Sequence, residues 1–261
     1  MDQRVNSLYF SPTGTTAQVV KAIAGGMDQE IKEYNITLAK DREKGLDFGE
    51  DDLVIVGVPV YGGRIPYFLE DYFAKVKGGH TPVVLVAVYG NRDYDDALLE
   101  LKNIFESNGF LVAAAGAFIG EHSFTYTVAT GRPDGEDLDI AARFGRKIKE
   151  KLTVVSANDW PGLPAIKGNY PYKERKAAPP MAPETGDQCI ACGTCAKCCP
   201  TGAIDWSDFA KADAKKCIRC CSCIKKCPVG AKAMQHEAFI NTRQFLIENC
   251  QSIRRQPELY V

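Results

Sequence analysis

Eight of the eleven cysteines stand in two nearly identical motifs in the last third of the chain. Each motif reads C-x-x-C-x-x-C-x-x-x-C-P, with Cys189, Cys192, Cys195 and Cys199 in the first and Cys217, Cys220, Cys223 and Cys227 in the second. Three thiolates at intervals of three residues can surround one metal cluster, and the proline after the fourth cysteine turns the chain away. The repeated pattern therefore predicts metal binding by thiolates.

Zinc sites and disulfide frameworks are the alternative interpretations of such cysteines. Neither motif contains a histidine, and each has four cysteines followed by proline, a combination that favours iron–sulfur clusters over zinc. The first residues, Met1 to Arg4, are polar and do not form a secretory signal sequence. We therefore expect reduced thiols and a cytoplasmic location, which disfavours disulfides.

The two motifs resemble those of bacterial ferredoxins with two [4Fe-4S] clusters. In that family the fourth cysteine of each motif ligates the cluster of the other motif. The resemblance implies one cluster ligated by Cys189, Cys192, Cys195 and Cys227. It implies a second cluster ligated by Cys217, Cys220, Cys223 and Cys199.

Three cysteines remain outside this assignment. Cys198 and Cys221 adjoin predicted ligands, but including either one would break the spacing of its motif, so we expect small buried side chains. Cys250 shares a helical stripe with Phe239, Leu246 and Ile253, which predicts a core position.

Composition divides the chain into four parts. A cysteine-free region, residues 1–155, precedes a connector, residues 156–183, in which six prolines between Trp160 and Thr185 disfavour helix and central strand. The resemblance to ferredoxins implies a small α+β domain over the cysteine-rich segment, residues 184–237, and residues 238–261 are expected to form a helical extension. Within the connector, Trp160, Tyr170 and Tyr172 are expected to anchor the chain by packing.

The first region alternates short apolar runs with amphipathic stretches. The runs at 5–10, 33–38, 52–58, 82–89 and 112–119 predict five buried parallel strands. Helical stripes are formed by Val19, Val20, Ile23 and Met27, and by Tyr94, Leu98, Leu101, Ile104 and Phe105, and a further helix is expected over 136–152. The pattern predicts a doubly wound α/β sheet with ligands beyond the carboxyl ends of its strands.

A hydroxyl-rich loop follows the first predicted strand directly. Its residues are Ser11, Pro12, Thr13, Gly14, Thr15 and Thr16. Four hydroxyls and the first amides of the next helix suit a phosphate monoester, although such a loop can also be a simple helix cap. The loop resembles the FMN phosphate loop of flavodoxins, T/S-x-T-G-x-T, and the resemblance implies a flavodoxin-like fold that binds FMN.

Two further loops occupy the places where flavodoxins enclose the flavin ring. One contains Pro59, Val60, Tyr61, Gly62 and Gly63, and the other contains Gly90, Asn91, Tyr94 and Asp95. The resemblance implies that Tyr61 and Tyr94 stack on the ring, that backbone groups bind its polar edge, and that Asp95 accepts a hydrogen bond from its imide. As alternatives, both tyrosines are ordinary turn aromatics and Asp95 is a first-turn helix acid.

His122 and Arg64 are weaker site candidates. His122 follows the fifth predicted strand, where it either faces the flavin or caps its own loop. Arg64 is either an anion contact near the flavin or a solvated surface residue.

Charge and missing motifs exclude several classes of function. The formal net charge is −1 with no basic tract, so nucleic acid is not an expected partner. No apolar run approaches the ~20 residues of a membrane span. No G-x-G-x-x-G follows a strand, which disfavours a dedicated nicotinamide-dinucleotide domain.

Taken together, the chain resembles the flavodoxin–ferredoxin fusion proteins of anaerobic bacteria and archaea. The resemblance implies electron transfer between FMN and two [4Fe-4S] clusters, with a redox protein or a small-molecule acceptor as partner. We favour a low-potential reductase or electron-transfer protein of anaerobic metabolism. A carrier without its own substrate and a redox-sensing interaction module are the alternatives.

Overall fold

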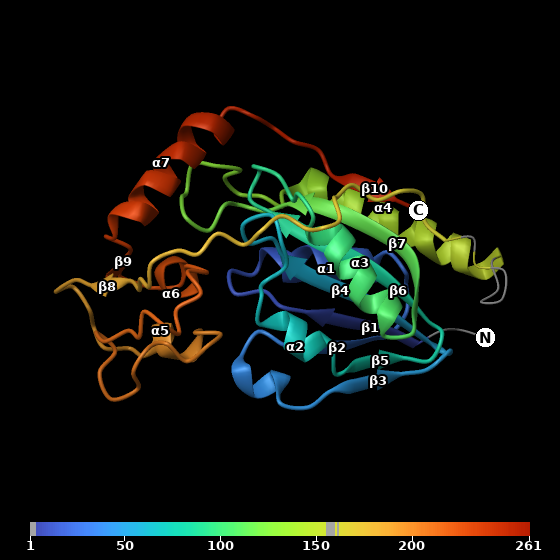
Figure 1. Ribbon diagram of the computed structural model, residues 1–261, viewed down its shortest axis with the longest axis horizontal. Helices are drawn as coiled ribbons and strands as arrows, with labels where there is room; N and C mark the ends of the chain where they lie inside the picture. Colours follow the sequence, from blue (N-terminus) through green and yellow to red (C-terminus); the bar gives the residue numbers. More distant parts are fainter. Residues whose placement is uncertain (1–3, 155–159, 161) are drawn as a thin grey trace.

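A six-stranded sheet forms the centre of the molecule (Figure 1). The computed structural model describes residues 4–154, 160 and 162–261, so the predicted domain boundary between residues 155 and 156 lies outside the described residues. The sheet has the order β10-β7-β6-β4-β1-β2. Its parallel strands are β1 (Arg4–Tyr9), β2 (Ile31–Asn35), β4 (Asp52–Pro59), β6 (Thr81–Tyr89) and β7 (Phe110–Ile119).

The sixth strand corrects the prediction of five. β10 (Glu258–Tyr260) comes from the C-terminal end and pairs antiparallel with β7. The predicted helical extension is therefore a helix, α7 (Glu237–Cys250), followed by a strand. The sequence pattern missed β10 because three residues are too short to show a strand period.

Helices cover both faces of the sheet. Alternate side chains of β6 point to opposite sides: Val83 and Leu85 join one apolar cluster, and Val84 and Val86 join the other. The first cluster includes residues of α2 (Leu69–Phe73) and α3 (Ala97–Ser107). The second includes residues of α1 (Thr15–Gly25) and α4 (Gly135–Val154). The α/β layers expected from the apolar runs are thus confirmed.

Smaller elements complete the structure. A 3-10 helix, η1 (Ala39–Arg42), precedes β3 (Leu46–Phe48), which pairs in parallel with β5 (Val76–Gly78). The cysteine-rich segment contains α5 (Thr194–Lys197), α6 (Ser222–Lys225) and the antiparallel pair of β8 (Glu184–Thr185) and β9 (Lys232–Ala233). Figure 1 shows this segment beyond the carboxyl ends of the parallel strands.

The connector packs along the surface of the sheet domain. The Trp160 indole donates to the Val112 carbonyl at 3.0 Å, and Tyr172 accepts a 2.7 Å hydrogen bond from Asn103. Tyr170, in contrast, is 76% exposed. Two of the three predicted aromatic anchors are therefore in contact with the domain. Among the described residues, no helix combines the length and apolarity needed to cross a bilayer.

Candidate functional site

The hydroxyl-rich loop connects β1 to α1. The Ser11 hydroxyl accepts a 3.0 Å hydrogen bond from the Ala17 amide, and the Ser11 amide donates to the Thr37 hydroxyl at 2.9 Å. Gly14 has a φ of 97°, a conformation that favours glycine, and it begins α1. These contacts fold the loop around the amino-terminal end of the helix.

The N-cap residue Gly14 has no side chain that could accept from the helix, and the first turn of α1 contains no acidic residue, so the Ser11 hydroxyl provides the side-chain contact to its first amides. Amides at a helix N-terminus attract anions, so an exogenous phosphate is a suitable partner for this end. Thr16 is only 1% exposed. Its methyl group lies near Gly57, where an added Cβ would approach it to 3.0 Å, so Thr16 also has a packing role.

The loop after β4 forms a tight turn. Tyr61 and Arg64 pair through their backbones, with the Tyr61 amide donating to the Arg64 carbonyl at 2.9 Å. Between them, Gly63 has a φ of 89°, and an added Cβ would lie 2.1 Å from Asp95 Oδ2. The loops after β4 and β6 are therefore in contact at Gly63, where only glycine fits. A flavin site formed by both loops requires that they lie this close together.

Tyr61 lies beside the cysteine-rich segment. It is half-buried and packs against the apolar core. Burial, with the neighbouring thiols of Cys220, Cys221 and Cys217, raises the pKa of Tyr61. The predicted flavin-stacking residue thus stands between the sheet domain and the second cysteine motif.

Tyr94 occupies a different place from the one predicted. Its side chain is fully buried in the core, and its hydroxyl contacts Glu258 at 2.6 Å and Tyr260 at 3.0 Å. No ring face is free for a flavin, which argues against the stacking role. The burial follows from β10, whose residues Glu258 and Tyr260 cover the Tyr94 hydroxyl. This strand was not predicted.

Asn91 is also tied to the C-terminal extension. Its side chain is 1% exposed and donates to the Cys250 carbonyl at 2.9 Å and the Ile253 carbonyl at 2.6 Å. Its backbone carbonyl accepts a 3.0 Å hydrogen bond from Arg255. These contacts give Asn91 a structural role. Gly90, which directly follows β6 and is half-buried, remains a candidate for contact with the flavin.

Asp95 already has two cationic partners. Arg92 and Lys173 both bind its carboxylate, Lys173 at 2.8 Å. Partial burial raises the pKa of Asp95, but the hydrogen bonds from Arg92 and Lys173 outweigh it and bring the pKa below its ordinary value. Asp95 is therefore an ionised acceptor at the edge of the site, held by the connector.

His122 caps its own loop. Its Nδ1 accepts a 3.1 Å hydrogen bond from the Phe124 amide, and its ring packs against Gly90. Burial, with the nearby charges of Lys225 and Arg92, lowers the pKa of His122 to about 4. The imidazole is therefore neutral near pH 7, which agrees with the capping alternative.

Arg64 is neither a free anion contact near the flavin nor a solvated surface residue, the two roles considered for it. Its guanidinium is buried and binds Glu100 in a bidentate pair at 2.7 and 2.6 Å, and it donates to the Lys173 carbonyl at 2.8 Å. The Glu100 hydrogen bond raises the pKa of Arg64. Arg64 thus anchors the connector. Glu100, 36 positions after Arg64 in the chain, gave no signal in the sequence as its partner.

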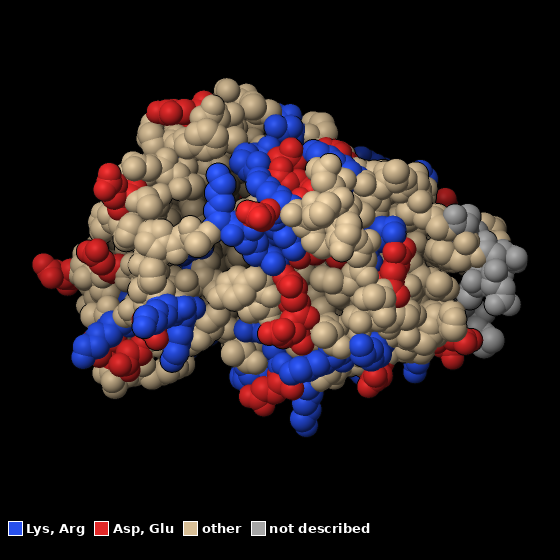
Figure 2. All heavy atoms as spheres, in the orientation of Figure 1, with Lys and Arg blue, Asp and Glu red and all other residues tan. Residues whose placement is uncertain are grey.

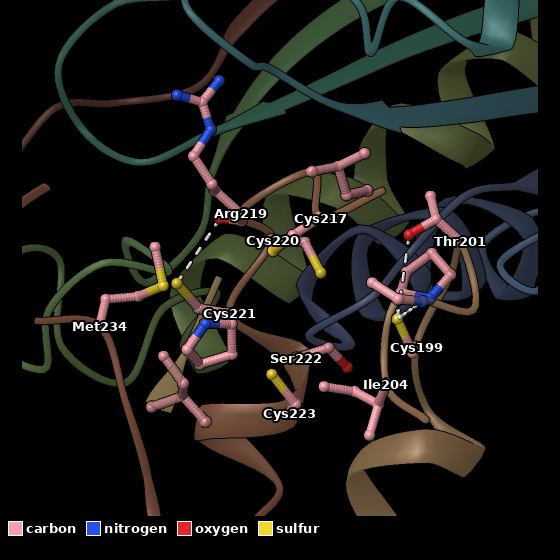
Figure 3. A pocket seen from close by; sticks show the side chains of 15 residues that line it. Cys199, Thr201, Ile204, Cys217, Arg219, Cys220, Cys221, Ser222, Cys223 and Met234 are labelled. Carbon is pink, nitrogen blue, oxygen red and sulfur yellow. Dashed lines mark hydrogen bonds between the residues drawn. The ribbon is translucent and has the colours of Figure 1, made fainter. Parts of the chain in front are cut away.

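Cysteines of both motifs line one cavity (Figure 3). Cys199 comes from the first motif, and Cys217, Cys220, Cys221 and Cys223 come from the second. The Ala203 amide donates to the Cys199 sulfur at 3.1 Å. Burial raises the pKa values of Cys217, Cys220 and Cys223. The set implied for one cluster by the crossover pattern is therefore gathered around a shared space, which we call the inner cysteine group.

The other four predicted ligands are more open. Cys189 and Cys192 are exposed, Cys195 is 8% exposed, and the Cys227 sulfur accepts from the Ala231 amide at 3.2 Å. We call these four the outer cysteine group. As the side chains stand, no three Cys, His, Asp or Glu residues within the described ranges have the geometry of a metal site.

The remaining cysteines lie outside both groups. Figure 3 shows the Cys221 sulfur turned toward Met234, and both residues belong to one buried apolar cluster. Cys250 is buried with Val128 and Leu246, as the helical stripe predicted. Cys198 is half-buried and its thiol contacts the Cys195 carbonyl at 3.5 Å.

Polar side chains join the cysteine-rich segment to the loops after the strands. The Ser222 hydroxyl donates to the Pro12 carbonyl, within the hydroxyl-rich loop, at 2.7 Å. Lys225 binds the Glu121 carboxylate at 2.6 Å. Arg42 donates to the Pro200 carbonyl at 2.8 Å. None of these contacts was predicted, since each depends on how the two parts dock.

Opposite charges are interspersed over the connector and the neighbouring loops. Figure 2 shows lysine and arginine side chains gathered near the middle of the viewed face with acidic side chains among them. The ion pairs here include Lys167 with Asp93 and Arg175 with Glu70. The basic side chains are thus balanced locally.

Several solved structures are similar to part of this chain. No curated protein matches the chain. A flavodoxin from the domain Archaea is 14% identical, covers 58% of this chain and 99% of its own, and has a TM-score of 0.42. Oxidised Flavodoxin 2 from Bacillus cereus is 18% identical, with coverages of 57% and 99% and a TM-score of 0.40. The apo form of an NADH:FMN oxidoreductase (EMOB) is 14% identical, with coverages of 60% and 94% and a TM-score of 0.42.

A family model gives the most specific match. The matched residues, 7–121, extend from β1 to the loop after β7 and include the hydroxyl-rich loop, the turn at Tyr61 and the loop at Gly90. The model describes a flavodoxin domain. This part of the chain is therefore a flavodoxin-like domain.

Proposed function

We propose that the protein is an iron–sulfur flavoprotein that transfers electrons between FMN and two [4Fe-4S] clusters. The hydrogen bond from Ser222 to the Pro12 carbonyl carries the proposal. It joins the helix of the second cysteine motif to the loop expected to bind the FMN phosphate. Cofactors bound at these two places would be neighbours in one molecule.

The residues around the hydroxyl-rich loop fit FMN. The hydroxyls of Ser11, Thr13, Thr15 and Thr16 and the first amides of α1 would bind the phosphate. The turn from Pro59 to Gly63, together with Gly90, would border the ring, with Tyr61 as the aromatic contact. Tyr94 has no part in this assignment, and Asn91 supports the loop.

The donor chemistry of the cysteines fits iron–sulfur clusters. Both groups consist of thiols only, and Cys199 and Cys227 each accept a backbone amide hydrogen bond at their sulfur. Hydrogen bonds to ligand sulfurs are a means by which proteins tune cluster potentials. The inner cysteine group would hold one cluster and the outer cysteine group the other.

The division of roles follows from the chemistry of the cofactors. Iron–sulfur clusters exchange single electrons, whereas a flavin exchanges one or two. The chain itself contributes ligands, orientation and exclusion of water. Ser222 is completely buried at the contact with Pro12, and the half-buried Ile218 packs against the core of the flavodoxin-like domain, so solvent is excluded at the Ser222 contact.

Anaerobic purification followed by analysis of flavin, iron and acid-labile sulfide tests the proposal. We expect one FMN with about eight iron and about eight sulfide per chain, the sum for two cubane clusters. A chain that contains zinc instead of iron, or one that does not bind flavin, would overturn the assignment.

A further inference from the structure

The two cysteine motifs form an internal repeat, and their non-cysteine positions can be compared pairwise. Aligning the first cysteine of each motif makes Ile190 equivalent to Ile218 and Lys197 equivalent to Lys225. It also makes Thr194, at the start of α5, equivalent to Ser222, at the start of α6. The repeat thus presents two similar faces, each with an apolar, a hydroxyl and a basic side chain.

The face of the second motif is fully occupied. Lys225 donates to Glu121 at 2.6 Å and to the Thr125 carbonyl at 2.9 Å, and its ammonium group lies 3.5 Å from the centre of the Tyr126 ring. Ile218 packs against the core cluster of the flavodoxin-like domain. With the buried Ser222 hydroxyl, these contacts dock the inner cysteine group on the flavodoxin-like domain.

The face of the first motif points into solvent. Ile190 is 62% exposed and Lys197 is exposed, and Lys197 makes no ion pair with any residue that the structure describes. The adjacent ligand candidates Cys189 and Cys192 are exposed as well. Equivalent positions of the repeat are therefore used in opposite ways.

We propose that this asymmetry sets the order of electron transfer: the inner cysteine group exchanges electrons with the flavin, and the outer cysteine group exchanges them with an external one-electron carrier protein. The inference rests on the proposed function. One electron leaves the reduced carrier, which is thereby oxidised, and enters through the outer group before it reaches the inner group and the flavin. No bond forms or breaks, and with an oxidised carrier the same route runs in reverse.

The geometry makes the opposite order unfavourable. A carrier that approached the inner cysteine group would have to displace Ser222 from Pro12 and Ile218 from the core. A carrier that approached Ile190 and Lys197 would displace only water. The exposed face also offers a cation, which suits a carrier protein with surface carboxylates.

Two matched lysine variants test the order in the loaded protein. Reduced bacterial two-[4Fe-4S] ferredoxin is the probe donor, and stopped-flow absorbance follows clusters and flavin separately. In Lys225→Met, electrons should reach the clusters at the normal rate, but flavin reduction should slow by about tenfold or more, because the docking contact is loosened. In Lys197→Met, flavin reduction by the clusters should be unchanged, while the first step from the ferredoxin should slow.

Ser222→Ala provides a second variant with a smaller structural change, and it should slow the same step as Lys225→Met. The proposal is overturned if both docking variants leave the cluster-to-flavin step intact. It is also overturned if Lys197→Met slows that step as much as Lys225→Met does.

Iron release offers a readout that does not depend on electron transfer. With a water-soluble iron(II) chelator, about half of the iron should leave rapidly from the exposed outer group and the rest slowly. Cys192→Ala should abolish the rapid phase and Cys220→Ala the slow phase; the reverse assignment contradicts the proposal. A protein without iron or FMN would refute the proposed function, whereas a fully loaded protein with reversed phases refutes only the order.

Discussion

The Tyr94 hydroxyl lies 2.6 Å from the Glu258 carboxylate and joins the last strand of the chain to the flavodoxin-like domain. We expect Tyr94→Phe to lower the free energy of unfolding by about 1–2 kcal/mol, because it removes the hydrogen bond but keeps the buried ring. Chemical denaturation measures the change. Tyr170→Phe, at a 76% exposed position, is the control and should have no effect. Equal stability of Tyr94→Phe and the unmodified protein would contradict the prediction.

The buried pair of Arg64 and Glu100 predicts a larger loss. Arg64→Met removes the bidentate partner of the Glu100 carboxylate, which is 2% exposed and keeps only 3.0 Å contacts with Arg175 and the Ile65 amide, and it should cost about 3 kcal/mol of stability. Lys102→Met removes only the surface pair with Glu106, so it should cost less than about 0.5 kcal/mol. Thermal and urea unfolding compare the two variants. Similar losses of stability would show that the buried Arg64–Glu100 pair stabilises the fold no more than the surface pair does.

The sheet was predictable because its strands are buried on both faces. Runs such as Val83 to Val86 are apolar without alternation, and only a covered parallel sheet requires that pattern. The addition of β10 was not predictable, because the pairing of Leu259 with Gly116 joins residues far apart in the chain and depends on the route of the C-terminal extension.

The candidate site was predictable where one local segment defines it. The loop from Ser11 to Thr16 lies at the start of α1, as its strand–loop–helix context indicated. The positions and contacts of the Tyr94 and Arg64 side chains were not predictable. Both residues are bound by parts of the chain that are distant in sequence, Glu258 for the tyrosine and Glu100 for the arginine.

The low pKa of His122 predicts a pH dependence of stability. Burial, together with Lys225 and Arg92, lowers its pKa from 6.5 to about 4 in the folded protein, so below pH 6.5 the unfolded chain binds the proton more readily. Stability should therefore fall as the pH decreases from 6.5 toward 4, by at most about 1.4 kcal/mol per pH unit from this residue.

His122→Asn keeps an acceptor for the Phe124 amide but cannot take up the proton. Its stability should depend less on pH in that window than the stability of the unmodified protein. His80→Asn, at an exposed turn, is the control and should leave the pH dependence as it was. Parallel pH profiles for the unmodified protein and His122→Asn would exclude His122 as the cause.

The hydroxyl-rich loop predicts a loss of flavin affinity that is separable from a loss of fold. Thr16→Val keeps the methyl group next to Gly57, and Thr13→Ala changes a half-buried side chain. Each change should weaken FMN binding by about tenfold, the value of one hydrogen bond to a charged group. Fluorescence titration of the apoprotein measures the affinity, and Thr130→Val is an exposed control. If a protein with both Thr13→Ala and Thr16→Val binds FMN with unchanged affinity, neither hydroxyl belongs to the phosphate site.

Adjacent cysteines allow the sharpest test of the ligand assignment. Cys220 and Cys221 both line the cavity with Cys199, but the Cys221 sulfur turns toward Met234 (Figure 3), with which it shares a buried apolar cluster. Cys220→Ala should therefore lower the iron content by about half, because the inner group loses a ligand, while Cys221→Ala should retain all the iron and lose only some packing. Iron and sulfide analysis of anaerobically purified proteins decides between them. If Cys221→Ala loses iron and Cys220→Ala does not, the ligand register is displaced by one residue and the inner group must be redrawn.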